Sequence, residues 1–378
     1  MANALDYIYW RGDLSFAQSP FNRIDYLICS QMAAPDYSGI IDAEGEGVTI
    51  SEVEKKYFDA SDTAQRNLGV LQSSYVLPTL HALAGCVRYA DVKMAHYVNR
   101  ISNENEEQFS AVTFLLPDGT LCVSYRGTDD TFIGWKEDFH LATREHVPAQ
   151  KDALDYLVEV ASVFSGDIRV CGHSKGGNLA VYAGVMAPEE LQGRIISICS
   201  FDGPGFRTEF LESEQYKAAE GKIQTVLSQN SLVGMLLHMA GTPVIVKTNI
   251  SGPMAHDGFS WEVLGTEFIR CDELSDGSKA FRDAMASTLD AMNTEEKESF
   301  VNELFDSFMA GGAETITDFT DFNLSNAIEV AKSFRSGKEV NRFVLNVMEA
   351  MRKSYRQQIA EDITEKTAKI INHHISSI

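Results

Sequence analysis

Between about residues 108 and 261, short runs of apolar residues alternate with longer stretches that repeat apolar positions every three or four residues. The short runs are typical of buried strands, and the longer stretches are typical of helices that pack on a sheet. Strands that alternate with helices along a chain build a mostly parallel sheet. The pattern therefore predicts an α/β fold, with a mostly parallel central sheet flanked by helices.

The predicted strands begin with a hairpin, in which residues 110–115 and 121–125 flank a Pro-Asp-Gly turn at 117–119. Further strands are predicted at 168–171, 195–201, 223–227 and 243–247. One helix is predicted from an apolar face formed by Leu154, Leu157, Val158, Ala161 and Phe164. Residues 179–186 are apolar all round, as expected for a helix buried beneath a sheet.

The two ends of the chain differ from this central region. We expect residues 1–265 to form the α/β domain, with a helical or irregular lead-in at 1–107 and a core at 108–265. Residues 266–378 have few strand-like runs and several helix starts, such as Asn293 before Thr294-Glu295-Glu296. A later stripe at helical spacing comprises Val344, Met348, Met351, Tyr355 and Ile359. Residues 266–378 are therefore predicted to be a helical extension packed on the core.

Composition and charge exclude several classes of function. The chain has 44% hydrophobic and 23% charged residues, the balance of a soluble globular protein. Its 54 acidic and 32 basic residues give a net charge of -22, which argues against binding nucleic acid or an anionic membrane surface. No run of eighteen apolar residues occurs, so no membrane-spanning helix is predicted.

The cysteines and the first residues bear on the compartment. The six cysteines are scattered without a Cys-x-x-Cys pair, which predicts reduced thiols rather than disulfides or a zinc site. Residues 1–6 lack the basic and apolar segments of a secretion signal, so we expect a cytoplasmic protein. No Gly-rich loop ends in Gly-Lys-Ser/Thr, and we expect neither a cofactor nor a bound metal.

The most informative motif is Gly172-His173-Ser174-Lys175-Gly176, a G-x-S-x-G pattern between a predicted strand and an apolar helix. A serine in a tight strand-to-helix turn adopts strained backbone angles, and glycines on both sides remove the collisions that side chains would cause there. The turn exposes the hydroxyl above the sheet, and the amide of Lys175 can stabilise an oxyanion. The motif predicts Ser174 as a nucleophile.

A second motif supports the first. Val123-Ser124-Tyr125-Arg126-Gly127-Thr128 ends a predicted strand, and Trp135-Lys136-Glu137-Asp138 follows. With the serine motif, these residues resemble the class 3 lipases, an α/β-hydrolase family, over roughly residues 108 to 262. The resemblance implies that the Thr128 amide is the other oxyanion donor, that Asp138 holds the Thr128 hydroxyl, and that residues 129–133 take the place of a lid. The opening at 9–22 resembles an uncharacterised bacterial branch of lipase-like proteins.

A serine hydroxyl needs a base, and α/β-hydrolases order the triad as serine, acid and histidine along the chain. Four histidines follow Ser174: His238, His256, His373 and His374. His256 lies in a glycine-bounded loop after the last predicted strand, in surroundings that resemble the family's His-x-Gly-x-x-Trp, and is the predicted base. His238 lies in an apolar stretch, and the last two lie in a polar tail. His173, inside the serine motif, is predicted to be a packing residue.

The acid is where the sequence departs from the family pattern. Residues 228–234, which follow the strand where class 3 lipases carry the aspartate, contain no carboxylate. Either the acid is Asp202, in a Gly-Pro turn one strand earlier, or Asn230 or Ser231 orients the imidazole without a charge. We favour Asp202. Asp257 adjoins His256, and it would have difficulty bending back onto the ring.

These residues predict a serine hydrolase that cleaves acyl esters, lipid-like or small, through an acyl-enzyme. Two alternatives stay open at this point. The missing family aspartate and the large extension are also consistent with a hydrolase fold kept as a binding or scaffold protein. Thioesters or peptides could equally be the substrate, because fold and motif do not distinguish acyl groups by what they are attached to. The acyl chain length, the alcohol half and the oligomeric state are not predicted.

Overall fold

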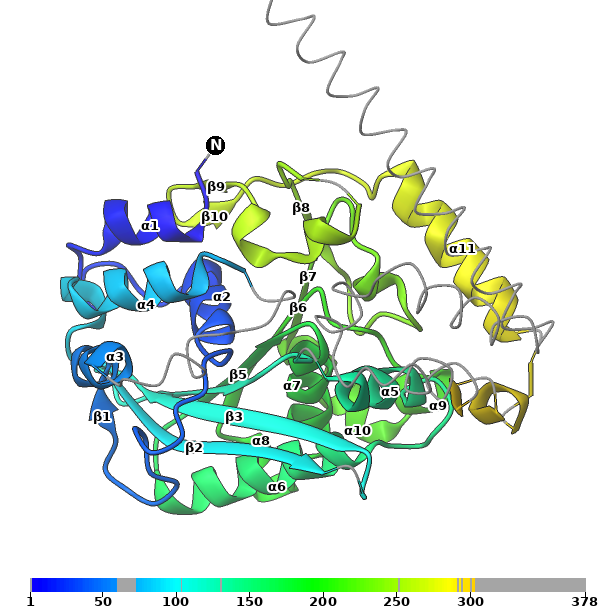
Figure 1. The fold of residues 1–378 in the computed structure, drawn as a ribbon, viewed down its shortest axis with the longest axis horizontal. Coiled ribbons are helices and arrows are strands. Elements are labelled where there is room, and N and C mark those ends of the chain that lie inside the picture. Colours follow the sequence, from blue (N-terminus) through cyan, green and yellow to red (C-terminus); the bar gives the residue numbers. More distant parts are fainter. Residues whose placement is uncertain are drawn as a thin grey trace, which may run out of the picture.

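The computed structural model describes residues 2–59, 73–102, 104–129, 131–250, 252–290, 292–293, 295–299 and 301–302. Within these residues, one eight-stranded sheet organises the chain, and its strands lie side by side in the order in which they occur (Figure 1). The strands are β1 (Val48–Thr49), β2 (Lys93–Ser102), β3 (Glu107–Leu115), β4 (Leu121–Tyr125), β5 (Ile168–His173), β6 (Ile195–Phe201), β7 (Ile223–Ser228) and β8 (Val244–Val246).

The direction of pairing changes at β4. Strands β1 to β4 pair antiparallel, and β4 to β8 pair parallel. The carboxyl ends of β4 to β8 therefore lie along one edge of the sheet, where the loops that follow them meet. In open α/β sheets, this edge is where ligands bind.

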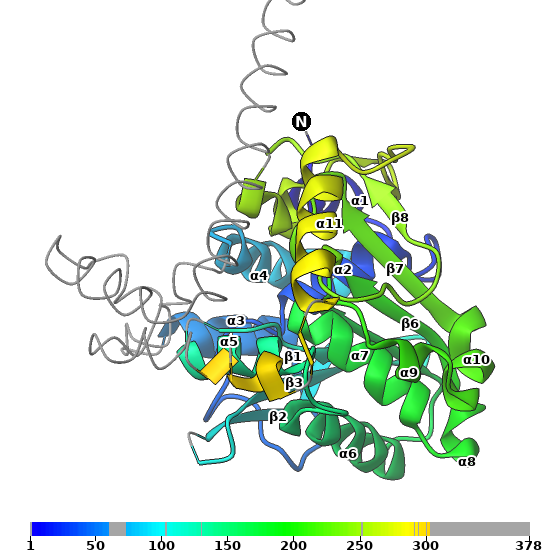
Figure 2. The same ribbon diagram turned by 90° about the vertical axis from the view of Figure 1, so that its right-hand side faces the viewer.

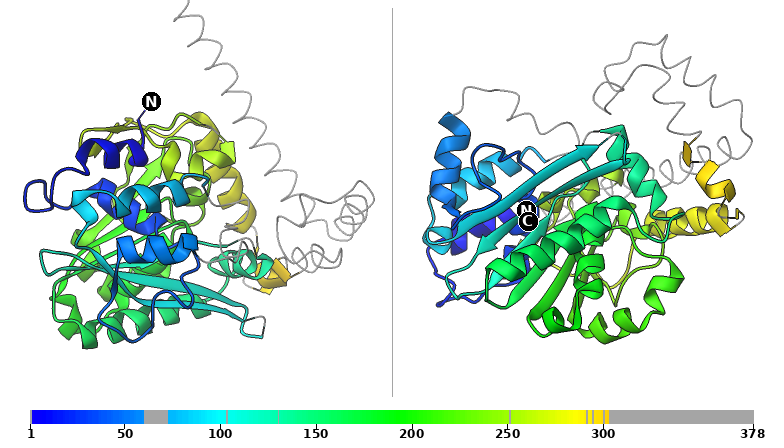
Figure 3. Two further views of the ribbon diagram at one scale, coloured as in Figure 1. Left: turned by 60° about the vertical axis from the view of Figure 1, so that its left-hand side comes forward. Right: turned by 90° about the horizontal axis from the view of Figure 1, so that it is seen from below.

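Helices cover both faces of the twisted sheet (Figure 3). One face packs against α1 (Ala4–Arg11), α2 (Arg23–Gln31), α3 (Ile50–Asp59) and α4 (Val76–Ala84). The other face packs against α6 (Pro148–Val163), α7 (Lys175–Met186) and α10 (Glu214–Ala219). The central strands read as nearly continuous apolar runs because both of their faces are buried.

The remaining elements are short, apart from α5 and the last helix. They are α5 (Phe132–His140), α8 (Glu189–Gln192), α9 (Thr208–Leu211) and α11 (Asp276–Asp290), the 3-10 turns η1 (Val87–Tyr89), η2 (Glu220–Lys222), η3 (Val233–Met235), η4 (Gly252–His256) and η5 (Gly258–Ser260), and a two-stranded ribbon of β9 (Val263–Leu264) and β10 (Glu267–Phe268).

Most predicted elements of the central region are confirmed. The hairpin is β3–β4, and the four further strand predictions correspond to β5, β6, β7 and β8. The predicted face of α6 is partly wrong, since Val158 is exposed whereas Tyr156 is buried. Tyr156 reaches the sheet because its hydroxyl is satisfied there, lying 2.6 Å from the His96 carbonyl oxygen and 2.9 Å from Thr113 Oγ1. A prediction from apolar residues alone does not identify a buried tyrosine of this kind, because it does not consider polar side chains that find hydrogen-bond partners in the core.

The prediction of a helical or irregular lead-in at residues 1–107 is wrong for β1 and β2, which belong to the sheet. β2 was missed because its alternation is interrupted. His96 has a positive φ of 55°, and the register with β3 shifts between Ala95 and Val98. An irregularity of this kind moves the following side chains to the other face, so no period-two pattern runs through the strand.

The C-terminal region is described only in part. α11 lies on the side of the molecule away from α1–α4 and packs on η3 (Figures 1 and 2). The predicted cap at Asn293 is present, since its Oδ1 accepts from the Glu296 amide at 2.9 Å. Backbone pairing with β8 continues to Cys271, whose amide donates to Ile245, so the division at residue 265 stays a prediction. The stripe predicted at 344–359 lies outside the described residues.

The mostly parallel sheet, its flanking helices and the tight turn between β5 and α7 are those of an α/β-hydrolase, and the predicted fold class is confirmed. All six cysteines are free thiols. In the part of the chain that the structure describes, no helix is both long and apolar enough to cross a bilayer.

Candidate active site

Ser174 occupies the turn between β5 and α7 in a strained conformation, with φ 59° and ψ -134°. The glycines around it are required by close backbone approach. A Cβ atom on Gly172 would lie 2.1 Å from the Gly176 carbonyl oxygen, and one on Gly176 would lie 2.1 Å from the Tyr125 carbonyl oxygen. The sequence therefore folds into the sharp turn that was predicted, with Ser174 at its apex and α7 beginning directly after it.

His256 and Asp202, which are 54 residues apart in the sequence, meet at the carboxyl edge of the sheet. Nδ1 of His256 lies 2.7 Å from Oδ2 of Asp202. A carboxylate only accepts hydrogen bonds, so the proton of this bond is on Nδ1 and the lone pair of the ring is on Nε2. The Asp202 side chain is fully buried, whereas the His256 side chain is 23% exposed.

The backbone around Asp202 aims its carboxylate. Asp202 follows β6 directly and adopts a positive φ of 50°, while its amide still donates to the Val226 carbonyl at 2.8 Å. Gly234 lies against the carboxylate, where a Cβ would be 2.8 Å from Oδ1. Asp202 Oδ1 is buried and has no hydrogen-bond partner among the described residues. The arrangement leaves His256 as the partner of this carboxylate.

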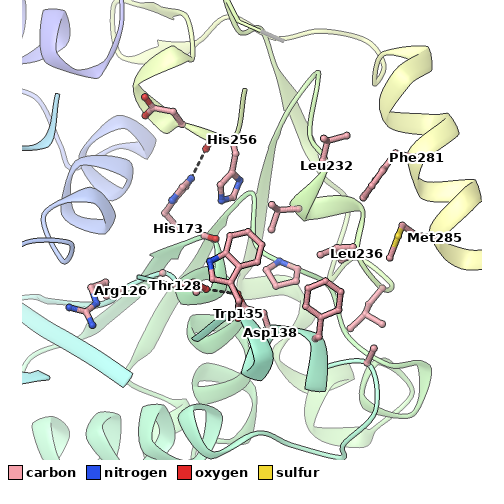
Figure 4. A pocket seen from close by; sticks show the side chains of 18 of the residues that line it. Arg126, Thr128, Trp135, Asp138, His173, Leu232, Leu236, His256, Phe281 and Met285 are labelled. Carbon is pink, nitrogen blue, oxygen red and sulfur yellow. Dashed lines mark hydrogen bonds between the residues drawn. The ribbon is translucent and has the colours of Figure 1, made fainter. Parts of the chain in front are cut away.

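The loop that carries His256 is held by two aromatic side chains. His173 Nε2 donates to the His256 carbonyl oxygen at 2.7 Å (Figure 4), and the two imidazole rings have centroids 4.5 Å apart. Burial lowers the pKa of His173 to about 3, and His256 adds to this effect, so His173 is neutral. The buried Trp261 donates from Nε1 to the Ala255 carbonyl at 3.0 Å. His173 thus packs as predicted, and it also fixes the backbone of His256.

The other residues weighed for the base and the acid lie elsewhere. His238 is exposed, and its backbone pairs with Phe206. Asn230 donates to the Ile250 carbonyl at 3.2 Å, and Ser231 Oγ accepts from the Gly234 amide at 3.1 Å. His373 and His374 lie outside the described residues.

Asp257 caps η5 instead of orienting His256. Its Oδ1 accepts from the Phe259 amide at 2.9 Å, and its Oδ2 accepts from Ser73 Oγ at 2.7 Å. Burial raises the pKa of Asp257.

Thr128 lines the same cavity as Ser174, and its role as an oxyanion donor stays a prediction. The residue before it, Gly127, approaches Ser174 closely, since a Cβ there would lie 3.0 Å from the Ser174 Cβ. Thr128 Oγ1 donates to Oδ2 of Asp138, in the last turn of α5 (Figure 4). Burial raises the pKa of Asp138 to about 7, and the nearby Lys175 acts in the opposite direction.

The side chain of Lys175 forms an ion pair that sequence reasoning missed. Its Nζ lies 2.5 Å from Glu137 Oε2 and 2.7 Å from the Gln108 carbonyl, and both charged side chains are 1% exposed. Glu137 also accepts from the amides of Gln108 and Ala149 at 3.1 and 2.8 Å. The pair therefore ties the first residue of α7 to β3, α5 and α6. The available signal was a lysine that opens an otherwise apolar helix.

A cavity of about 360 Å³ lies over these residues, lined by Ser174, His256, Thr128 and Asp138. Most of its other walls are apolar. They include Trp135, Phe139, Leu232, Leu236, Leu237, Met254, Phe281, Met285 and Val301 (Figure 4). Phe281 and Met285 belong to α11, so the predicted extension contributes directly to the cavity, which sequence reasoning did not anticipate.

The predicted lid region is partly helical, because α5 begins at Phe132 with Thr131 as its N-cap. Among the described residues, no group of three or more histidine, cysteine, aspartate or glutamate side chains is placed to hold a metal ion.

Several solved structures are similar in part. A Rhizomucor miehei lipase propeptide complex is 14% identical, with a TM-score of 0.34 over 46% of this chain and 59% of that one. The Lip2 lipase from Yarrowia lipolytica is 14% identical, with a TM-score of 0.36 over 50% and 73%. A triacylglycerol lipase from Penicillium expansum is also 14% identical, with a TM-score of 0.32 over 50% and 77%. The chain thus spans less than two thirds of the Rhizomucor miehei structure.

The curated proteins contain no match to this chain. The family model described as Mbeg1-like matches residues 83–306, which is more than half of the 378 residues and includes Ser174, Asp202 and His256. The chain belongs to the Mbeg1-like family.

Proposed function

We propose that the protein is a serine hydrolase that cleaves acyl esters through an acyl-enzyme. The observation that carries the proposal is the 2.7 Å pair between Asp202 and His256, in a site where Ser174 stands at a strained turn and shares a cavity with His256. Backbone strain at a serine is maintained only where the surrounding structure enforces it, and such strain is concentrated at functional sites.

In the first half of the reaction, His256 Nε2 takes the proton of the Ser174 hydroxyl while Oγ attacks the ester carbonyl carbon. The carbonyl π electrons move to oxygen, and the amides of Thr128 and Lys175 bind the resulting oxyanion. Such a donor contributes about 3 kcal/mol to the transition state. Asp202 holds the imidazole in the required tautomer and stabilises the imidazolium.

The tetrahedral intermediate collapses when the bond to the alcohol oxygen breaks and the alcohol takes the proton from His256. The acyl group remains on Ser174 Oγ. A water molecule then gives its proton to His256 Nε2 and attacks the acyl carbon. Collapse of the second intermediate releases the carboxylic acid and returns the proton to Ser174.

The walls of the cavity support an ester with an apolar acyl group as the substrate. Leu232, Leu236, Phe281 and Met285 line the cavity, and burial of each methylene of such a chain contributes about 0.8 kcal/mol to binding.

The expectation that the protein is cytoplasmic stays a prediction.

The direct test is covalent labelling of the full chain with a fluorophosphonate. We expect stoichiometric modification of Ser174, located by mass spectrometry, together with hydrolysis of short p-nitrophenyl esters. Ser174→Ala is the matched control and should lose both. An intact, folded protein that neither reacts nor turns over any ester would contradict the proposal.

The alternative of a catalytically weak scaffold rested on the missing family aspartate. Asp202 provides a carboxylate at His256 Nδ1, so that argument for a scaffold is weaker. A panel of esters, thioesters and amides with one common acyl group would identify the class that is cleaved. A clear preference for the amide would overturn the ester assignment.

A further inference from the structure

Three residues that line the cavity have a buried hydrogen-bond donor without a partner among the residues that the structure describes. One is Nε1 of Trp135, and the other two are Nε of Arg126 and Nε2 of Gln31. Both residues line the cavity, although the Arg126 side chain is only 7% exposed and Gln31 only 4%. Burying a donor without a partner is unfavourable, so each such group calls for an explanation, and an acceptor atom of a bound ligand is one that a cavity wall allows.

One side of the cavity is lined by a charged side chain and the other side by apolar side chains. Figure 4 shows Arg126 on one side of Thr128 and His256, and Phe281 and Met285 on the other. An acyl chain that occupies the apolar side while its carbonyl reaches the oxyanion donors directs the alcohol half of the ester toward Arg126. This step rests on the proposed function.

The guanidinium of Arg126 is fixed in place. Its Nη2 donates to Asn99 Oδ1 at 3.0 Å, and Asp129 Oδ2 lies 3.4 Å from the same nitrogen. Asp129 offsets part of the positive charge. The Nε–H of Arg126 is buried and has no hydrogen-bond partner among the described residues.

Gln31 comes from a different element, the last turn of α2, where it lies beside the loop of His256. A Cβ on Gly258 would be 2.9 Å from its Nε2. The nearby acid Asp257 has both oxygens engaged, by Ser73 Oγ and by the Phe259 amide. A fixed cation and an amide donor from two elements therefore line the same cavity.

We propose that Arg126 and Gln31 form a subsite for the alcohol half of the substrate, and that this half carries an anion, a phosphate foremost. Charge-assisted hydrogen bonds from arginine to phosphate oxygens are among the stronger ones in proteins. The substrate class is then an acyl ester of a phosphorylated alcohol, with a neutral acyl chain on the α11 side and the anion at Arg126.

The test measures binding in the full-length Ser174→Ala protein, so that turnover plays no part. Calorimetric titration with octanoylglycerol and with octanoylglycerol phosphate compares one acyl chain with and without the anion. We expect the phosphate to tighten binding about tenfold, the size of a charged hydrogen bond. Arg126→Gln should remove this preference, and Gln31→Leu should reduce it.

Arg126→Lys, which keeps the charge, should keep part of the preference. Arg100→Gln is the matched control, because Arg100 lies on β2, is half exposed, is not among the residues that line the cavity, and pairs with Asp152 at 3.3 Å. Glycerol phosphate and inorganic phosphate alone should bind much more weakly, because neither fills the apolar side. Thermal unfolding of each variant checks the fold, and Gln31→Leu decides the matter if Arg126→Gln does not fold.

Equal affinity for the two octanoyl compounds in Ser174→Ala would overturn the subsite, whatever the wild-type activity is. An equal loss of affinity for both compounds in Arg126→Gln would also overturn it, because that result indicates a structural role. A preserved phosphate preference without any hydrolysis by the wild type would contradict the proposed function and leave the subsite standing.

Discussion

The two walls of the cavity are built in different ways. On the sheet side, Ser174, Asp202 and His256 are positioned by the backbone: a strained turn, a positive φ after β6, and a carbonyl held by His173. On the α11 side, Phe281 and Met285 reach the cavity from a helix that follows the sheet and packs on the short turn η3. The chemistry and the shape of the cavity therefore depend on separate parts of the chain.

The difference lies in what each wall tolerates. Backbone contacts on the sheet side leave no room for change, as the 2.1 Å approach at Gly176 shows. Contacts between side chains on the α11 side can be altered one residue at a time. We therefore expect changes on the sheet side to lower kcat for every substrate, and changes on the α11 side to alter which acyl chain is preferred.

The largest effect is expected for Asp202→Asn. An amide in this place would favour the wrong tautomer of His256 and would not stabilise the imidazolium, and the corresponding change in a serine protease lowers kcat about ten-thousand-fold. Asp257→Asn is the control, because Asp257 contacts Ser73 and the Phe259 amide instead. Steady-state kinetics with a p-nitrophenyl ester measures both variants. Equal, small losses would show that Asp202 does not orient the base.

The next effect concerns the buried pair between Lys175 and Glu137. Glu137→Gln leaves a buried ammonium without its counter-charge, and the expected loss is about 3–5 kcal/mol in the free energy of unfolding. The double variant Lys175→Met/Glu137→Leu should recover part of this loss, because it removes both buried charges. The recovery is only partial, since the amides of Gln108 and Ala149 lose an acceptor. Urea unfolding measures all of these proteins. A Glu137→Gln protein as stable as the wild type would show that the pair does not hold α7.

The sheet side was largely predictable because its signals are local. The strand, the glycines and the serine of the turn lie within a few residues, and an apolar helix follows. The acid was left open, because the meeting of Asp202 with His256 depends on how the ends of β6 and η4 approach each other. The residues around Asp202 predict only a turn. The positive φ that orients its carboxylate cannot be predicted from the spacing of apolar residues.

The missed features are contacts between distant segments. The partner of Lys175 is 38 residues away in the sequence, and Phe281 is 107 residues from Ser174. The sequence contains a lysine at the start of an apolar helix, and it contains Phe281 and Met285 at helical spacing, which the sequence analysis did not single out. The partners of these side chains could not be predicted, because helical periodicity shows which face of a helix is buried and does not show what covers it.

The smallest effect, and the sharpest test of the comparison, is expected on α11. Phe281→Ala should enlarge the apolar side of the cavity and shift the preference toward longer acyl chains. Discrimination of one methylene is about 10-fold or somewhat more, which sets the scale of the change in relative kcat/KM. The measurement is kcat/KM for p-nitrophenyl esters from acetate to laurate, and kcat for the preferred ester should change little.

Arg282→Ala is the matched control, because this neighbour on the same helix is exposed and contacts Asp283. If Phe281→Ala and Arg282→Ala both leave the chain-length profile unchanged, α11 does not limit the space for the acyl chain. The conclusion that α11 sets the acyl preference while the sheet side sets kcat would then be wrong. If Phe281→Ala instead lowers kcat equally for every ester, α11 supports the catalytic residues themselves. A shifted profile with an unchanged kcat is the result that the separate construction of the two walls requires.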